Sequence, residues 1–211
     1  MGDSILSVAS PRECGVDNPI NLPDLNVVEL LKSHGIQPDK RLGQNFLIDS
    51  TYLRRVADAG NITKDDTVLE VGAGLGSLTR LLGMQAKEVI AVELDAYLIP
   101  ILTQVTNPFP NIHIIQRDIL EIDPGELTTS TGYLVVANIP YYITSNLIRH
   151  LLTGNIRPRR VVLTIQKEVA ERICAQPDKL SLLALSVQVF GHPMILSRVP
   201  AGAFYPVPKV D

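Results

Sequence analysis

The sequence predicts an α/β fold in which helices cover both faces of a doubly wound, mostly parallel β-sheet. From Thr67 onward, short apolar runs alternate with stretches of helical periodicity. The apolar runs are rich in Val and Ile and do not alternate in polarity, which is typical of strands that are buried on both faces. Strands and helices that alternate along a chain favour a parallel sheet of the doubly wound kind.

The expected elements follow one another at short intervals. Strands are predicted for the runs TVLEVG, EVIAVEL, NIHIIQ, YLVVAN and RVVLTIQ, at residues 67–72, 88–94, 111–116, 133–138 and 160–166, and a sixth for MILSRVP at 194–200. Helices are predicted between them at residues 78–86, 96–105, 146–154, 167–175 and 180–191. No internal repeat or low-complexity tract interrupts this order, so one main core is expected.

The N-terminal part of the sequence has a different character. Residues 1–22 contain Pro, Asn and Ser without periodicity, so we expect a loose arm. Two amphipathic helices should follow, at residues 24–35 with Asp24 as N-cap and Gly35 as stop, and at residues 50–60 with Ser50 and Thr51 as caps. We therefore divide the chain into an N-terminal arm with a short helix, residues 1–40, and a main domain, residues 41–211.

Composition excludes several classes of protein. The chain has 211 residues, of which 45% are hydrophobic and 19% charged, a globular composition. Apolar runs are too short to span a membrane, and no apolar signal core is visible near Met1. Two distant cysteines and four histidines form no ligand cluster. We expect a cytoplasmic monomer without a metal. The net charge of −3 argues mildly against a dedicated nucleic-acid binder.

A glycine-rich loop follows the first predicted strand. Glycines there let the backbone approach a ligand and expose helix N-terminal amides. A dinucleotide site requires G-x-G-x-x-G, whereas Gly72, Gly74 and Gly76 place the third glycine one residue too early. Glu93 ends the next strand, 21 residues after Gly72, where a carboxylate accepts hydrogen bonds from ribose hydroxyls. Asp118, after the third strand, is suited to an adenine amino group. The cofactor predicted is S-adenosylmethionine; a tight turn with helix-capping acids is the structural alternative.

The stretch NIPYYIT, residues 138–144, ends the fourth predicted strand. The Asn138 side chain and the backbone of Ile139 each offer a carbonyl oxygen that accepts hydrogen bonds from an amine. Pro140 fixes φ and disfavours helix at the residue before it, and Tyr141 offers a ring on which a flipped-out base can stack. This arrangement indicates methylation of an adenine amine. A turn with two half-buried tyrosines is the alternative.

Four motifs resemble the rRNA adenine N6-dimethyltransferases. They are RLGQNFLID, VLEVGAGLGSLT, NIPYYITSNLI and FYPVPKVD, at residues 41–49, 68–79, 138–148 and 204–211. The resemblance implies a Rossmann-like methyltransferase fold. It implies that Asn45 and Leu47 close over S-adenosylmethionine beside Gln44, and that Gly72, Glu93 and Asp118 hold its methionine, ribose and adenine parts. The expected cofactor site also includes Gly74, Leu94, Ile119 and Asn138. Tyr141 and Phe204 would stack on the two faces of the target adenine; otherwise Phe204 is a core aromatic.

The same resemblance implies an rRNA substrate and the absence of the family's C-terminal helical domain. The family's usual target is two adjacent adenines in a hairpin near the 3′ end of small-subunit rRNA, each receiving two methyl groups. The chain would lack the C-terminal helical domain and a strand that runs antiparallel inside the sheet, which could leave two strands poorly joined. We expect cofactor binding to be intact and substrate recognition to be weakened.

Two groups of arginines are candidates for contact with RNA. Arg157, Arg159 and Arg160 form a basic cluster, and Arg54 and Arg55 lie on the second helix. A solvated face is the alternative for both groups, and it is the favoured interpretation for Arg54 and Arg55. The alternatives to the small-subunit dimethyltransferase are a macrolide-resistance type methyltransferase of large-subunit rRNA, a non-catalytic ribosome-assembly factor, and a nicotinamide-dependent oxidoreductase. The glycine spacing disfavours the last.

Overall fold

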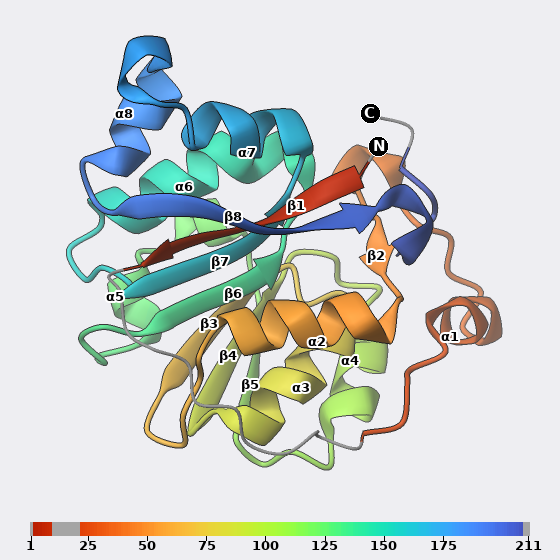
Figure 1. Ribbon diagram of the computed structural model, residues 1–211. Helices are drawn as coiled ribbons and strands as arrows, with labels where there is room; N and C mark the ends of the chain where they lie inside the picture. Colours follow the sequence, from red (N-terminus) through yellow and green to blue (C-terminus); the bar gives the residue numbers. More distant parts are fainter. Residues whose placement is uncertain (1, 10–21, 209–211) are drawn as a thin grey trace.

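A seven-stranded sheet forms the centre of the molecule (Figure 1). The computed structural model describes residues 2–9 and 22–208. The strand order is β5-β4-β3-β6-β7-β1-β8, and all neighbours from β5 to β7 pair in parallel. A doubly wound α/β fold was predicted from the alternation of apolar runs and helical stretches, and the structure confirms it.

The elements agree with the predicted order within a few residues. The strands are β1 (Gly2–Ala9), β2 (Phe46–Leu47), β3 (Thr67–Val71), β4 (Glu88–Glu93), β5 (Ile112–Gln116), β6 (Leu134–Asn138), β7 (Arg160–Ile165), β8 (His192–Pro200) and β9 (Phe204–Tyr205). The α-helices are α1 (Val27–Ser33), α2 (Ser50–Ala59), α3 (Ser77–Gln85), α4 (Ile99–Thr106), α5 (Pro124–Leu127), α6 (Thr144–Thr153), α7 (Lys167–Ile173) and α8 (Leu182–Gln188).

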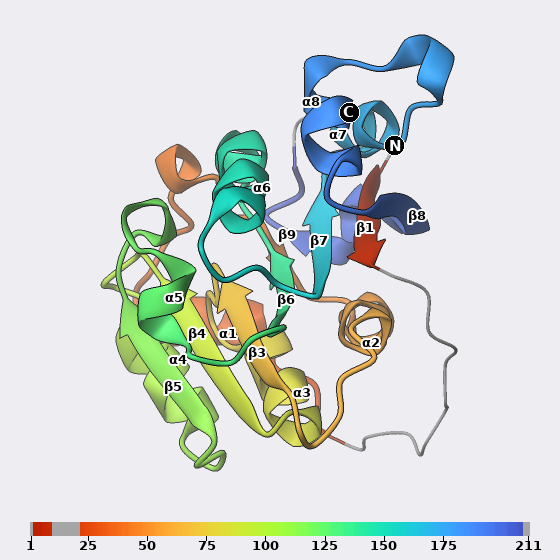
Figure 2. The ribbon, with the colours of Figure 1, turned by 90° about the vertical axis from the view of Figure 1, so that its left-hand side faces the viewer.

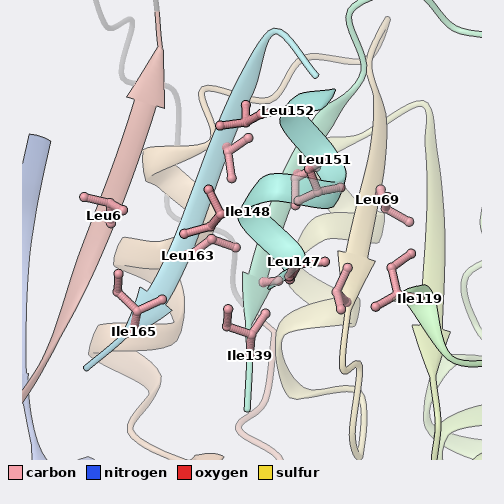
Figure 3. Close-up of a cluster of buried hydrophobic side chains, with 14 of the residues drawn as sticks. Leu6, Leu69, Ile119, Ile139, Leu147, Ile148, Leu151, Leu152, Leu163 and Ile165 are labelled. Atoms are coloured by element: carbon pink, nitrogen blue, oxygen red, sulfur yellow. The ribbon is translucent and has the colours of Figure 1, made fainter. Parts of the chain in front are cut away.

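Helices cover both faces of the sheet because the central strands are apolar on both faces. Successive residues of β3 point to opposite faces of the sheet and belong to different hydrophobic clusters. Val68 packs with the side chains of α2 and α3, and Leu69 packs with those of α6. Figure 2 shows α2 and α6 on opposite sides of the sheet. Figure 3 shows the cluster under α6, in which Leu147 and Leu151 lie near Leu69 and Ile119.

The helix caps differ from those predicted. The N-cap of α1 is Asn26 rather than Asp24, and its side chain accepts a hydrogen bond from the Glu29 N–H. The N-cap of α2 is Asp49, whose carboxylate accepts a hydrogen bond from the Thr51 N–H. Asn and Asp side chains satisfy the free amides of a first turn well. The predicted caps Asp24, Ser50 and Thr51 each lie one or two residues away from the N-cap position, from which a side chain reaches those amides.

The N-terminal segment is the main correction to the predicted fold. Residues 2–9 were expected to belong to a loose arm, but they form β1, which lies between β7 and β8 and is antiparallel to both. The two strands that we expected to be poorly joined are therefore joined through β1. The remaining residues of that arm up to residue 21 lie outside the described ranges.

A second, two-stranded sheet connects the far end of the chain to the main domain. In it β2 pairs with β9, so that Leu47 lies opposite Phe204. The Ala203 carbonyl also accepts a hydrogen bond from the Ile48 N–H at 2.8 Å. The short strands β2 and β9 were not predicted, because two residues are too few to show a periodic pattern.

Candidate active site

A pocket lies at the carboxyl edge of the sheet, beside the loops that follow β3, β4, β5 and β6. It contains about 1040 Å³ of space without protein atoms, part of it open to solvent. Open α/β sheets bind ligands at this edge because the loops that follow neighbouring parallel strands come together there.

The glycine loop between β3 and α3 forms the floor of the pocket. Gly72, Gly74 and Gly76 all have positive φ, of 72°, 58° and 86°. A Cβ atom at Gly74 would lie 3.2 Å from the ring of Phe46, and one at Gly72 would lie 3.5 Å from Pro140. Side chains at these positions would strain the backbone and occupy the pocket, so glycine is required for both reasons.

Two carboxylates stand at the ends of β4 and β5. Glu93 is 7% exposed, and its oxygens accept hydrogen bonds from the backbone amides of Gly74, at 2.7 Å, and Asp95, at 2.8 Å. Burial raises the pKa of Glu93, and these amides partly offset the rise. Asp118 accepts a hydrogen bond from the Leu120 N–H at 2.9 Å. Each carboxylate oxygen has a second lone pair, so both residues retain acceptor capacity for a ligand.

The segment before β2 closes one side of the pocket. The Gln44 side chain donates to Asp95 at 2.6 Å and accepts from the Asp39 N–H at 2.7 Å, so both ends of its amide are engaged. The Asn45 side chain donates to the Gly43 carbonyl at 3.2 Å. Gln44 therefore anchors the segment to the end of β4, which leaves the following residues against the pocket.

The Asn138 side chain is oriented by this same segment. Its Nδ2 donates to the backbone carbonyl of Asn45 at 3.2 Å. Because only the amide nitrogen can donate, this hydrogen bond leaves the Asn138 side-chain oxygen as an acceptor. Pro140 is extended, with φ −61° and ψ 137°, so the chain leaves β6 without entering a helix until Tyr141.

Comparison with known proteins assigns this arrangement to a family. Residues 36–211 match the model of the family described as ribosomal RNA adenine dimethylase. The chain belongs to this family. A curated relative, ribosomal RNA small subunit methyltransferase A of Dehalococcoides mccartyi (strain CBDB1), is 45% identical over 184 residues, which cover 87% of this chain and 63% of the relative. The enzyme of the same name from Geobacillus kaustophilus (strain HTA426) is 39% identical over 190 residues, 87% of this chain and 65% of that protein.

Solved structures of similar proteins share the fold. A 23S rRNA methyltransferase, ErmE, has a TM-score of 0.70 and 28% identity over 79% of this chain and 66% of that one. A dimethyladenosine transferase from Plasmodium falciparum has a TM-score of 0.68 and 31% identity over 77% of this chain and 59% of that one. The Rossmann-like methyltransferase fold expected from the motifs is confirmed. The chain spans about 63% of the length of the first curated relatives.

The structure brings the predicted residues of this dimethylase-family site together, with one exception. Those that line the pocket are Gln44, Asn45, Leu47, Gly72, Gly74, Glu93, Leu94, Asp118, Ile119, Asn138, Ile139, Pro140 and Tyr141. Phe204 does not line it. Its side chain is 2% exposed and belongs to a core cluster with Leu47 and Leu53. A base cannot stack on a ring that other side chains cover, so this geometry matches the core position left open as the alternative.

Among the lining residues that were not predicted as site residues, two have side chains suited to a role in the site. Tyr142 is 57% exposed at the pocket, and its ring would lie 3.3 Å from a Cβ atom at Gly43. Glu70 is 1% exposed on β3, and burial raises its pKa to about 8, with the charge of Glu93 adding to the rise. Its Oε2 has no hydrogen-bond partner among the described residues. A single carboxylate within an apolar strand was the available signal for Glu70.

The basic cluster before β7 lies at the opposite edge of the sheet from the family's pocket. Arg159 donates to Asp66 at 2.8 Å, and Arg160 donates to the carbonyls of Ala59 and Gly60 at 3.3 Å each. The Arg157 guanidinium stacks over the ring of Phe190 at 4.9 Å. All three arginines thus contact other parts of the chain itself, and the expected RNA-contacting role of the cluster has no support from its position.

The described residues contain neither a membrane-spanning helix nor a cluster of metal-ligating side chains. Within residues 2–9 and 22–208, no helix combines the length and apolar character needed to cross a membrane. In the same ranges, no group of three or more His, Cys, Asp or Glu side chains is arranged to hold a metal ion.

Proposed function

We propose that this chain is the methyl-transferring part of an S-adenosylmethionine-dependent rRNA adenine N6,N6-dimethyltransferase. Its substrate is a pair of adjacent adenines in a hairpin near the 3′ end of small-subunit rRNA. The observation that carries the proposal is the position of Asn138: its free acceptor oxygen lies at the same pocket as the glycine loop and Glu93. Membership of the dimethylase family and the small-subunit relatives support this choice of substrate.

The charge of the pocket supports the cofactor. Glu93 and Asp118 line it, with Arg117 as the cationic side chain among the lining residues, whereas Glu70 holds its proton at neutral pH and adds no full charge. S-adenosylmethionine carries a cationic sulfur and an ammonium group, whereas a nicotinamide dinucleotide carries an anionic pyrophosphate. An acidic pocket attracts the former and repels the latter. Glu93 and Asp118 are placed to accept hydrogen bonds from the ribose and the adenine.

The chain's own residues prepare the target amine. When bound, S-adenosylmethionine supplies an electrophilic methyl group. An adenine amine is a poor nucleophile because its lone pair is delocalised into the ring. The Asn138 side-chain oxygen and the Ile139 carbonyl accept hydrogen bonds from the amine, which favours a tetrahedral nitrogen with a localised lone pair. Tyr141 stacks on the flipped-out base and holds it in this position. The amine releases its proton to water after transfer, so no general base is required.

Labelled methyl transfer from S-adenosylmethionine to unmethylated ribosomal subunits tests the proposal. We expect label in the small subunit, mapped to two adjacent adenines near the 3′ end of its rRNA. Label in the large subunit would instead assign the activity suggested by the similarity to ErmE. The subunits should be tested with this chain and with the relative from Dehalococcoides mccartyi (strain CBDB1), of whose length this chain spans 63%. Label in neither subunit with either protein would contradict the proposal.

Asn138→Ala separates the enzyme from a non-catalytic assembly factor. The enzyme loses methyl transfer, and an assembly factor retains its whole function. Calorimetry with S-adenosylmethionine and with NAD addresses the oxidoreductase. We expect heat of binding with the former only, and binding of NAD alone would overturn the assignment of the cofactor.

A further inference from the structure

A short bridge segment, residues 43–46, crosses the glycine loop from one neighbouring strand to the other. In the sheet, β3 lies between β4 and β6. On the β4 side, the Gln44 side chain bonds to Asp95, which follows that strand. Phe46 lies over the loop after β3, since its ring would be 3.2 Å from a Cβ atom at Gly74. The bridge segment therefore covers the loop at which we expect the cofactor.

The same segment reaches the end of β6. The backbone carbonyl of Asn45 accepts a hydrogen bond from the Asn138 side chain at 3.2 Å. Gly43 lies against the residues that follow β6, because a Cβ atom there would be 3.3 Å from the Tyr142 ring and 3.4 Å from Pro140. The orientation of the Asn138 amide therefore depends on where the bridge segment lies.

Gln44 closes the turn that leads into the bridge segment. Its side-chain oxygen accepts a hydrogen bond from the Asp39 N–H at 2.7 Å, and its backbone N–H donates to the Asp39 carbonyl at 3.3 Å. Between these two residues, a single 3-10 turn at residues 40–42 ends at Gly43, which has a positive φ of 61°. With its oxygen held by this turn, the Gln44 amide reaches Asp95 through its nitrogen.

Asp95 is a well-fixed anchor for that nitrogen. It is 9% exposed, and its carboxylate accepts hydrogen bonds from the Gln44 side chain at 2.6 Å and from the Tyr97 N–H at 2.9 Å. Its backbone N–H donates to Glu93 at 2.8 Å, and its carbonyl accepts from the Leu98 N–H at 3.0 Å. The turn between β4 and α4 thus holds Asp95 in place beside the carboxylate that should bind the ribose.

We propose that Gln44 is a positioning residue for methyl transfer. Its hydrogen bond to Asp95 fixes the bridge segment across the glycine loop, and the fixed segment orients Asn138 through the Asn45 carbonyl. Although Gln44 lines the pocket, both the oxygen and the nitrogen of its amide are engaged by the chain itself. It acts through its neighbours rather than as a ligand of the cofactor. The effect on methyl transfer rests on the proposed function; the effect on the order of the bridge segment does not.

Exchanging the two partners of this hydrogen bond tests the role of Gln44. Gln44→Glu sets two carboxylates against each other, and Asp95→Asn sets two amide nitrogens against each other, so each single variant loses the hydrogen bond. The double variant regains it with donor and acceptor exchanged. A carboxylate at position 44 can still accept from the Asp39 N–H, and an amide at position 95 can still accept from the Tyr97 N–H.

Three quantities are measured for each variant. Calorimetry gives the affinity for S-adenosylmethionine, and labelled transfer to unmethylated small subunits at saturating cofactor gives the turnover. Hydrogen exchange followed by mass spectrometry gives the protection of residues 43–46. We expect each single variant to lower affinity and turnover by about tenfold, as for a lost hydrogen bond to a charged group. Exchange in the bridge segment should be about tenfold faster, while β3 and β6 keep their protection. The double variant should return all three to within about threefold of the unmodified chain.

Gln85→Glu is the matched control. The Gln85 side chain on α3 donates to Asp58 on α2 at 3.5 Å, which is the same pair of groups at an exposed place that does not line the pocket. This variant should leave all three quantities unchanged. Gln44→Ala removes the contact without adding a charge and serves if Gln44→Glu does not fold. Adding Asp95→Asn to Gln44→Ala should cause no further loss, because the partner is already gone.

Three outcomes would overturn the proposal. Normal exchange, affinity and turnover in Gln44→Glu would show that the bridge segment does not need this hydrogen bond. A loss in Gln44→Glu that Asp95→Asn neither shares nor repairs would make Gln44 a direct ligand of the cofactor. Equal loss of protection in β3 and β6 would assign the pair to overall stability. If the exchange results hold while the unmodified chain binds no S-adenosylmethionine and transfers no methyl group, Gln44 still fixes the bridge segment, and the proposed function fails alone.

Discussion

The two edges of the central sheet use their polar groups differently. At the amino edge, Arg159 pairs with Asp66, and Arg160 donates to two backbone carbonyls. At the carboxyl edge, Glu93 is held by backbone amides, and Glu70 has an oxygen without a partner among the described residues. Polar groups at the amino edge therefore satisfy one another and stabilise the fold. At the carboxyl edge, by contrast, an acceptor on Glu70 is used by no described residue. The following predictions test this contrast.

The largest effect is expected at the carboxyl edge from Asn138→Ala. It removes an acceptor from the target amine, and the loss of one such group lowers turnover by roughly a hundredfold or more. The affinity for S-adenosylmethionine, measured by calorimetry, should change much less. The control is Asn146→Ala, the same substitution at an exposed position on α6, which should leave turnover unchanged. Turnover within a few-fold of the unmodified chain would remove Asn138 from the chemistry.

The stability of the fold should depend on the buried carboxyl of Glu70. Its pKa is raised from 4.5 to about 8, so the folded state holds the proton more tightly than the unfolded state. Its contribution to stability is therefore fully present below pH 4.5 and is lost as the pH rises toward 8. Glu70→Gln cannot ionise, so its free energy of unfolding relative to the unmodified chain should improve by on the order of a few kcal/mol between pH 5 and pH 8.

Denaturant unfolding at a series of pH values measures this difference. The control is Glu126→Gln, an exposed glutamate near the amino edge, for which the difference should stay constant. A difference for Glu70→Gln that does not change with pH would show that this carboxyl ionises normally.

A pair of glycines compares backbone strain at the two edges. Gly74 at the pocket and Gly132 before β6 both have positive φ, of 58° and 83°. Ala should cost about 1–2 kcal/mol of stability at each. Only at Gly74 does the added methyl group meet a pocket wall, 3.2 Å from Phe46, whereas at Gly132 it meets the Arg159 side chain at an ordinary 3.7 Å. Gly74→Ala alone should weaken S-adenosylmethionine binding by about tenfold, as measured by calorimetry. Equal affinities in the two variants would separate the glycine loop from the cofactor.

A smaller effect is expected at the mouth of the pocket. Tyr142 offers an exposed ring there, and stacking of a base on an aromatic side chain contributes about 1–3 kcal/mol. Tyr142→Ala should raise the KM for RNA by about tenfold, and Tyr142→Phe should restore it. Tyr97→Ala removes a 77% exposed ring that does not line the pocket and should change nothing. An unchanged KM in Tyr142→Ala would assign this ring to packing against Gly43.

The predictable part of the fold is the part built from local connections. Strands β3, β4, β6 and β7 are buried along almost their whole length, and each follows a helix or loop in sequence order, so composition and periodicity identify them. The strand β1 could not be identified, because residues 2–9 are short and pair only with strands that lie far away in sequence. Its place in the sheet results from tertiary contacts that local propensity does not encode.

Single site residues could likewise be predicted only where their positions follow from the local sequence. Gly72, Glu93, Asp118 and Asn138 were predicted at the pocket because each ends a predicted parallel strand, and strand ends meet at one edge. The position of Phe204 depends instead on the pairing of β9 with β2, which no pattern revealed, and the structure buries its ring. The arginines before β7 were interpreted by charge alone, although the strand predicted at residues 160–166 already places them at the amino edge of a parallel sheet.

The smallest effect is expected for the salt dependence of RNA binding, which should differ between an arginine near the carboxyl edge and one at the amino edge. Arg41 lies beside the pocket segment, and its side chain is 91% exposed although it pairs with Asp39, whereas the Arg159 side chain is 45% exposed and paired at the amino edge. If RNA approaches the carboxyl edge, Arg41→Ala should reduce the salt dependence of RNA binding by roughly 0.7–0.9 in the logarithmic slope, the value of one phosphate contact. Arg159→Ala should leave the slope unchanged and lower stability by at most about 1 kcal/mol, as expected for a partly exposed ion pair. Fluorescence anisotropy with a labelled rRNA hairpin at several salt concentrations measures both slopes. A reduced slope in Arg159→Ala alone would place the RNA at the amino edge and reverse the contrast between the two edges.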